Sequence, residues 1–393
     1  MHVLGRREGG ERDATGPTGG SEPTGRLGWF RARDGSRGAP VGVDLDRPHA
    51  GLVVGKRGSG KSYTLGVFAE ELAATGGVAP VVLDPLDAFD GLEVCGFVTR
   101  NPRIRAGSLD PPAWCDLLGL DPTDPAGSVV WRAASERGSL DGMRSFVDDA
   151  AVPDPTTRAA SNHLDLAASW GVFDPAGLDP AALTTRPTRI SLSGLDPEPA
   201  SAVVSAVLGG CYRARLREAT DRLPWLLVDE AHAFVGSVAE PALRRVLTRG
   251  RAPGTSLVLA TQRPSALPEV AASQADLLIA HRLTGRADRE ALERARPAVA
   301  RIGAERRPEE PGEAVVFDDT GESVHAVRVR ERETPHGGSA PRVSERFSPR
   351  VGRPSAPDDG ETDTAASDDP GTRRSTTPGE PTATGTGGES DGA

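Results

Sequence analysis

Residues 55–62 combine three glycines, a lysine and a hydroxyl at the spacing of a phosphate-binding loop. They read Gly-Lys-Arg-Gly-Ser-Gly-Lys-Ser and fit the pattern G-x-x-x-x-G-K-S. In such a loop the backbone N–H groups surround an anion, Lys61 reaches the β- and γ-phosphates, and the Ser62 hydroxyl ligates Mg²⁺. We therefore expect ATP and Mg²⁺ to bind here. The expected nucleotide-binding residues are Gly55, Lys56, Arg57, Gly58, Ser59, Gly60, Lys61, Ser62 and Tyr63.

Lysine usage also draws attention to this loop. Lys56 and Lys61 are the only lysines of the chain, and every other basic side chain, histidine aside, is an arginine. A compact ammonium fits the phosphate site of Lys61, where a planar guanidinium would not. No comparable reason follows for Lys56.

Two acids follow a buried strand near the middle of the chain. Leu226–Val228 are apolar, and Asp229 and Glu230 come directly after them. In enzymes with this kind of loop, the first acid holds Mg²⁺, partly through water, and the second orients and deprotonates the attacking water. We expect these roles for Asp229 and Glu230, and a structural role for His232 on the following helix.

Polar residues also end two other predicted strands. Gln262 follows the strand 256–261, and we expect it to sense the γ-phosphate, with a strand-end cap as the alternative. Asp84 ends the strand 81–84 and either contacts the water or the residues around Mg²⁺ or is the acceptor of a turn closed by Pro85.

Arg249 and Arg251 precede the strand that ends at Gln262. If the protein forms a ring, one of them can enter the neighbour's site as an arginine finger. If it does not, they pair with acidic surface.

The elements that must position these residues predict an α/β fold. Buried strands alternate with amphipathic helices, and polar residues fall at the carboxyl ends of the strands, where open α/β sheets bind ligands. A hairpin at 314–329 closes the sheet, and residues 27–30 and 41–45 form short strands ahead of the loop strand. Between about 100 and 187 we expect a small helical insertion, with a strand at 101–106 and helices near 111–118, 129–137, 140–149 and 161–170.

Composition limits the remaining possibilities. We expect residues 1–26 to be a disordered leader, 27–338 one ATPase domain, and 339–393 a disordered acidic tail, because the terminal segments hold few apolar residues. Cys95, Cys115 and Cys211 lack metal-site spacing and fit reduced thiols in a cytoplasmic protein. No apolar run is long enough to span a membrane.

The net charge of −10 bears on partners and origin. Any nucleic acid must bind to a local basic patch, for which the arginines 103, 105, 132, 137 and 144 are candidates unless they are ordinary solvated surface. An excess of acidic over basic residues, together with only two lysines, is typical of either a halophilic archaeon or a GC-rich genome.

The chain resembles the HerA/FtsK superfamily of ring-forming ATPases, especially HerA-like proteins of halophilic archaea. The resemblance spans about residues 40–338 and rests on five stretches: 55–65, 226–230, Arg249-Gly250-Arg251, 260–264 and 332–338. It implies a RecA-like P-loop core with a mostly parallel sheet, ATP hydrolysis with Mg²⁺, a hexameric ring around double-stranded DNA and a nuclease partner. Family members usually carry an N-terminal β-barrel, for which residues 1–46 are too short.

Two other functions compete with a DNA motor. Asp229-Glu230-Ala231-His232 spells the DEAH motif, but a DEAH-box helicase needs a second RecA-like domain, and only about 100 ordered residues are expected after the motif. An ATP-dependent switch or assembly factor that moves no DNA is the other alternative.

Overall fold

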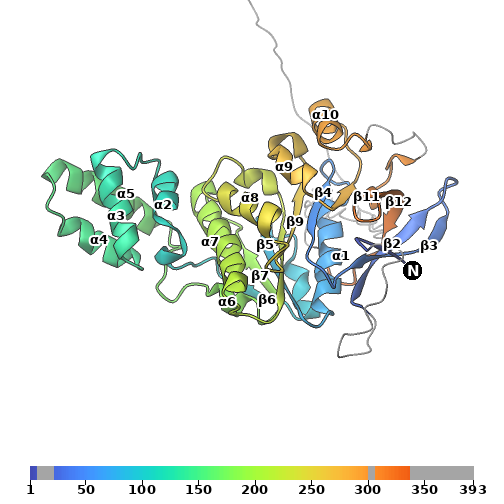
Figure 1. Ribbon diagram of the computed structural model, residues 1–393, viewed down its shortest axis with the longest axis horizontal. Coiled ribbons are helices and arrows are strands. Elements are labelled where there is room, and N and C mark those ends of the chain that lie inside the picture. The colour runs from blue at the N-terminus through green and yellow to red at the C-terminus, as the bar shows by residue number, and fades with distance from the viewer. Residues whose placement is uncertain (7–21, 300–305, 337–393) are drawn as a thin grey trace, which may run out of the picture. The chain divides into compact units, whose positions relative to one another are not determined.

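The computed structural model describes residues 1–6, 22–299 and 306–336 (Figure 1). The expected acidic tail, 339–393, and most of the expected leader lie outside these residues. Within them, no helix has the length and apolar character that crossing a membrane requires.

Seven neighbouring parallel strands form the centre of the sheet, in the order β10-β4-β9-β8-β5-β7-β6. They are β4 (Ala50–Val54), β5 (Val78–Asp84), β6 (Val98–Arg100), β7 (Thr188–Ser191), β8 (Leu223–Val228), β9 (Ser256–Thr261) and β10 (Leu277–Ala280). Because these strands are parallel, their carboxyl ends share one edge of the sheet. The loop at 55–62, Asp229 and Gln262 therefore come together, and the expected α/β fold is confirmed.

The sheet continues beyond β10 with strands that run mostly antiparallel. The described strands of this side are β11 (Glu313–Asp318), β12 (Ser323–Val329), β2 (Thr24–Arg31), β3 (Arg37–Asp44) and β1 (His2–Leu4). The hairpin β11–β12 forms as predicted. β2 pairs with β3 and with β12, and neither β2 nor β3 pairs with β4.

Apolar side chains alternate between the two faces of the central strands. Leu52 and Val54 of β4 join one buried cluster, whereas Val53 joins the other. The first cluster includes residues of α7 (Pro197–Leu216) and α8 (Glu240–Arg249), and the second includes Leu65 and Phe68 of α1 (Lys61–Ala73). The phosphate loop is therefore held between a strand buried on both faces and a helix packed against one of them.

The helical insertion lies between β6 and β7. Figure 1 shows its main helices as a separate group, α2 (Pro111–Leu118), α3 (Pro125–Glu136), α4 (Leu140–Asp148) and α5 (Asp154–Ser169). Asp110 caps α2 by accepting from the Ala113 N–H at 3.1 Å, and Gly119 ends it in the left-handed conformation. The short α6 (Pro180–Leu183) leads back to the sheet, and α9 (Glu269–Ser273) and α10 (Arg286–Ala295) flank β10 in sequence.

Two local predictions were wrong. The expected strand 101–106 reduces to isolated bridges from Ile104 to Phe173 and Leu178, because the next residues turn into a short 3₁₀ helix. The described ends of the leader are ordered: β1 pairs with β3 and buries Leu4, and β2 begins at Thr24. The low apolar content of residues 1–26 as a whole predicted disorder, but short strands can form here because they pair with the edge of the sheet.

Cys115 and Cys211 are buried free thiols, and Cys95 is a half-buried one. Burial raises the pKa of Cys211 to about 12, which keeps it protonated.

Candidate nucleotide-binding site

The phosphate loop joins β4 to α1 and is shaped by its glycines. Gly58 and Gly60 have φ of 75° and 113°, a left-handed conformation that favours glycine. A Cβ on Gly55 would lie 2.4 Å from the Ser59 Oγ, so only glycine fits there. The Lys56 N–H donates to the Arg282 carbonyl at 2.8 Å, and this bond ties the loop to the segment after β10.

Lys61 is the buried cation of the site. Its side chain is only 5% exposed, and its Nζ donates to the Lys56 carbonyl at 3.2 Å. Burial lowers the pKa of Lys61, while the charges of Glu230 and Asp229 act in the opposite direction. The ammonium is thus held between the loop and the two acids.

Ser62 and Asp229 meet at the first turn of α1. The Ser62 hydroxyl donates to the Asp229 Oδ2 at 2.7 Å, although the two residues are 167 positions apart. Asp229 is fully buried, and burial raises its pKa to about 6. A buried hydroxyl–carboxylate pair is a suitable donor set for a hard divalent cation.

Glu230 lies beside this pair in an uncommon conformation. Its φ is 46°, and its N–H donates to the Asp229 Oδ1 at 2.9 Å. Its Oε2 lies 3.3 Å from the His232 Nδ1, without hydrogen-bond geometry, and is buried without a partner. Burial raises the pKa of Glu230, partly offset by the charges of Lys61 and Arg57. A half-buried carboxylate with a raised pKa is suited to accept a proton.

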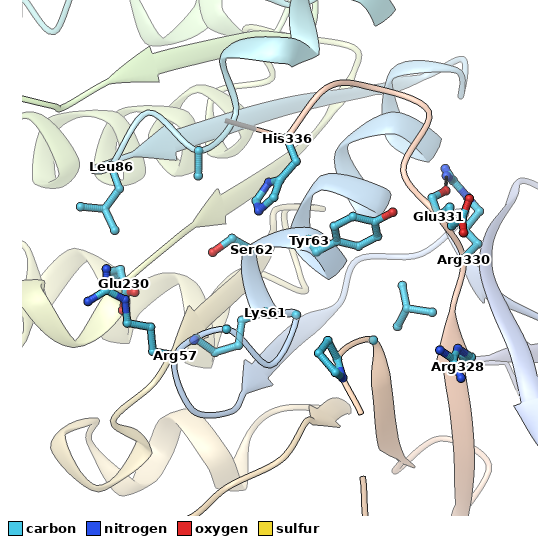
Figure 2. Close-up of a pocket in the computed structure, with 16 residues that line it drawn as sticks. Arg57, Lys61, Ser62, Tyr63, Leu86, Glu230, Arg328, Arg330, Glu331 and His336 are labelled. Atoms are coloured by element: carbon cyan, nitrogen blue, oxygen red, sulfur yellow. Dashed lines mark hydrogen bonds between the residues drawn. The ribbon is translucent and has the colours of Figure 1, made fainter. Parts of the chain in front are cut away.

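A cavity of about 640 Å³ opens above these residues (Figure 2). The phosphate loop and Glu230 line one part of it, and the end of β12 with the chain that follows lines another. The lining residues are Arg57, Gly58, Gly60, Lys61, Ser62, Tyr63, Leu86, Ala88, Glu230, Pro311, Gly312, Arg328, Val329, Arg330, Glu331 and His336.

Residues 330–336, which we call the strap, cross α1 and complete the cavity wall. The Arg332 N–H donates to the Tyr63 hydroxyl at 2.6 Å, and the rings of His336 and Tyr63 are 5.8 Å apart. The Glu70 Oε1 accepts from the N–H groups of Glu333 and Thr334, at 3.0 and 2.9 Å. The family resemblance included 332–338, but no role in the site was predicted for this segment; the available signal was a glutamate on the apolar side of α1.

His281 is a second missed residue, buried behind the loop. Its Nδ1 donates to the Glu313 carbonyl, and its Nε2 accepts from the Thr64 hydroxyl, each at 2.8 Å. Burial lowers the pKa of His281 to about 4, so the ring is neutral and braces the start of α1.

Asp84 makes the contacts of a turn acceptor. Its carboxylate accepts from the N–H groups of Ala88 and Phe89 at 3.0 Å and from the Arg189 Nε at 2.8 Å. It does not line the cavity. These contacts fit the role of turn acceptor, the second of the two roles expected for Asp84.

Three predicted site residues, Gln262, Arg249 and Arg251, do not line the cavity. Gln262 follows β9, which lies between β4 and β8, so it sits at the edge of the sheet where the nucleotide is expected, but it does not line the cavity. Arg249 is the last residue of α8 and Arg251 lies between α8 and β9, at the opposite edge. Both are exposed, and they are not brought together with Lys61.

The residues present fit Mg²⁺. The described residues contain no cluster of three or more His, Cys, Asp and Glu side chains that could hold a metal ion alone. A magnesium site that is completed by phosphate oxygens and water needs fewer protein ligands, and Ser62 and Asp229 supply two. The unpartnered Glu230 Oε2 is available to a nearby water.

Comparison with known proteins supports the resemblance. Residues 26–139 match a family model described as the central domain of the helicase HerA. Over this segment the chain is HerA-like. The match includes the phosphate loop and ends before Asp229. Among curated proteins, no match was found.

Solved structures extend the likeness of the fold. VirB4 of Thermoanaerobacter pseudethanolicus matches with a TM-score of 0.59 and 17% identity, over 80% of this chain and 98% of that one. The bacterial conjugative coupling protein TrwB, without its first 70 residues, matches with a TM-score of 0.52 and 16% identity, over 76% and 88%. At these identities the likeness establishes the fold, a RecA-like P-loop ATPase fold.

Proposed function

We propose that the protein is a Mg²⁺-dependent ATPase that forms a hexameric ring and moves along double-stranded DNA. The observation that carries the ATPase is the Ser62–Asp229 hydrogen bond, with Lys61 and Glu230 lining the adjoining cavity. Two distant motifs thereby supply a phosphate site, a cation site and a base at one point of the sheet.

Each residue has a role that follows from its position. Lys61 balances the charge of the β- and γ-phosphates, and Ser62 and Asp229 would hold Mg²⁺, which neutralises charge on the phosphate oxygens when bound. Glu230 orients the attacking water and takes its proton. Gln262 completes the site as the γ-phosphate sensor.

DNA is the proposed partner for two reasons. The matching family is described as a helicase. In addition, residues 282–307 carry eight arginines and four acids in a chain of net charge −10. This basic segment starts directly after β10, and its first residue, Arg282, accepts the hydrogen bond from the phosphate loop. Nucleotide and DNA can therefore act on one connected element.

The test measures ATP turnover against protein concentration, with and without duplex DNA. We expect turnover to rise cooperatively with concentration and to be stimulated by the duplex. Lys61→Ala should abolish ATP binding, whereas Glu230→Gln should bind ATP without turnover. Turnover that ignores both concentration and DNA would instead identify an ATP-dependent switch.

The DNA contact has its own test. Arg289 and Arg307 are exposed members of the basic segment. Replacing both by alanine should remove stimulation by DNA and leave basal turnover in place, and the salt dependence of DNA binding should become shallower. Arg158→Ala, an exposed arginine of α5, is the matched control. Unchanged stimulation in the double variant would refute this contact.

A further inference from the structure

Arg57 is a cation that the phosphate-loop pattern does not require. It occupies one of the four free positions between Gly55 and Gly60, where the pattern accepts any residue. Its side chain is exposed and lines the same cavity as Lys61 and Glu230. Figure 2 shows it directed from the loop toward Glu230. Arg57 therefore lies on the side of the loop that faces Glu230, the proposed base.

The positive charge of Arg57 acts on Glu230. Among the described residues its guanidinium has no hydrogen bond or ion pair, whereas many other arginines of the chain are paired. Its positive charge counteracts the rise in the pKa of Glu230. Because the Arg57 side chain is exposed, it can adjust its position when a ligand binds.

The other candidate arginines cannot do this within one subunit. Arg249 and Arg251 lie at the opposite edge of the sheet, beyond the N-terminal end of β9. Any help from them must come from a second copy. Arg57 needs no partner, because it belongs to the loop that holds the phosphates.

We propose that Arg57 is a catalytic residue that acts in cis, contacting the γ-phosphate of ATP and stabilising the charge that develops during its transfer. This inference rests on the proposed ATPase function. A bond forms between the water oxygen and the γ-phosphorus while the bond from that phosphorus to the bridging oxygen breaks. The electron pair leaves with ADP, and the water proton passes to Glu230. The planar guanidinium can donate two parallel N–H bonds to the phosphate oxygens, which an ammonium cannot.

The first experiment separates catalysis from binding in the full-length protein. We expect Arg57→Ala to lower kcat by about 10³-fold or more, as loss of an arginine finger does, and to change the Kd for ATP far less. Arg57→Lys should recover only part of kcat, because it restores the charge without the planar fork. Arg158→Ala should behave as wild type.

The possible results distinguish failure of the proposed ATPase function from failure of the role of Arg57. A wild-type protein without ATP turnover would refute the proposed function itself. An active wild type with an unchanged kcat in Arg57→Ala would overturn the role of Arg57 alone. A raised Kd with an unchanged kcat would make Arg57 a binding group and would also overturn it. Matched thermal melting of the variants controls for folding.

The second experiment distinguishes action in cis from action in trans. Arg57→Ala subunits are mixed with Lys61→Ala subunits, each of which lacks a different part of the site. If Arg57 serves its own loop, no mixed subunit has a complete site and turnover stays at the level of the separate variants. Recovery of turnover on mixing would show that Arg57 acts on a neighbour and would overturn the proposal.

Discussion

At the scale of single residues, the site keeps a carboxylate where water cannot reach it. Asp229 is fully buried, and within the described part of the chain its carboxylate accepts from the Ser62 hydroxyl and the Glu230 N–H. Burial raises its pKa from 3.8 to about 6. At neutral pH the Asp229 carboxylate is therefore ionised, although the folded protein favours its protonated form. This lowers the stability of the fold, and a bound cation offsets the loss.

We predict that Asp229→Asn stabilises the protein while abolishing Mg²⁺-dependent turnover. A pKa raised by about 2 units contributes stability below the unfolded value of 3.8 and loses it as pH rises through about 6, so at pH 7.5 the cost is about 3 kcal/mol. The variant should unfold at higher denaturant concentration at pH 7.5 and show no such advantage at pH 4. Equal stability of variant and wild type at both values would contradict the assigned burial cost.

Motif spacing predicted which residues meet but not how they meet. The pairing of Ser62 with Asp229 could be expected, because both follow strands whose carboxyl ends share an edge. The left-handed backbone of Glu230 and its contact with His232 could not, since both depend on the turn after β8. The direction of Arg57 was equally hidden, because its position in the loop pattern accepts any side chain.

At the scale of elements, α1 and the strap depend on one buried glutamate. The Glu70 carboxylate accepts hydrogen bonds from two backbone N–H groups and from the Thr334 hydroxyl at 2.6 Å, and it forms an ion pair with Arg330 at 2.7 Å. A Cβ on Gly66 would lie 2.5 Å from the Arg332 guanidinium, so the strap packs closely on α1. The cavity wall formed by His336 is therefore held in place by contacts farther along the same face of α1.

We predict that Glu70→Ala frees the strap and weakens ATP binding. Removing the carboxylate leaves the N–H groups of Glu333 and Thr334 without their acceptor, at a cost of about 1–3 kcal/mol for each buried donor, while Arg330 keeps its pairing with Glu71. Hydrogen exchange should speed up in residues 330–336, and the Kd for ATP should rise. Glu136→Ala, on the exposed side of α3, should change neither. Unchanged exchange in the strap would show that Glu70 is not its anchor.

The same anchor should respond to acid. Burial alone would raise the pKa of Glu70, but hydrogen bonds from Thr334 and Arg330 hold it below the ordinary 4.5. Its contribution to stability is therefore present above pH 4.5 and is lost as pH falls further. Exchange in the strap should accelerate below this pH in wild type but not in Glu70→Ala, where it is already fast.

Elements with clear end signals were predicted best. The helix 111–118 was predicted with its observed bounds, because Asp110-Pro111 starts it and Gly119 stops it. β6 and β1 have three residues each and carry no signal that a sequence pattern can detect. The strap has no regular structure, so its position depends on tertiary contacts alone.

At the scale of the whole molecule, the phosphate loop and the two arginines Arg249 and Arg251 lie at opposite edges of one sheet. The phosphate loop, Asp229 and Glu230 follow the carboxyl ends of β4 and β8, whereas Arg249 and Arg251 precede β9. The intervening helix α8 carries the chain from one edge to the other. A head-to-tail arrangement of subunits is the geometry that can bring these two edges together, and it closes into a ring when the rotation allows.

We predict that at least one of Arg249 and Arg251 completes the site of a neighbouring subunit. Alanine at that position should slow turnover by about 10³-fold or more while ATP still binds, because the phosphate loop of the same chain is intact. Mixing this variant with Lys61→Ala subunits should restore part of the turnover, since each phosphate loop that works can then receive an arginine from a subunit that lacks only Lys61. The same mixture made with Arg57→Ala should not recover, because Arg57 and Lys61 share one loop. Wild-type turnover in both Arg249→Ala and Arg251→Ala would leave Arg57 as the arginine that acts on the γ-phosphate and would refute a finger in trans from these two positions.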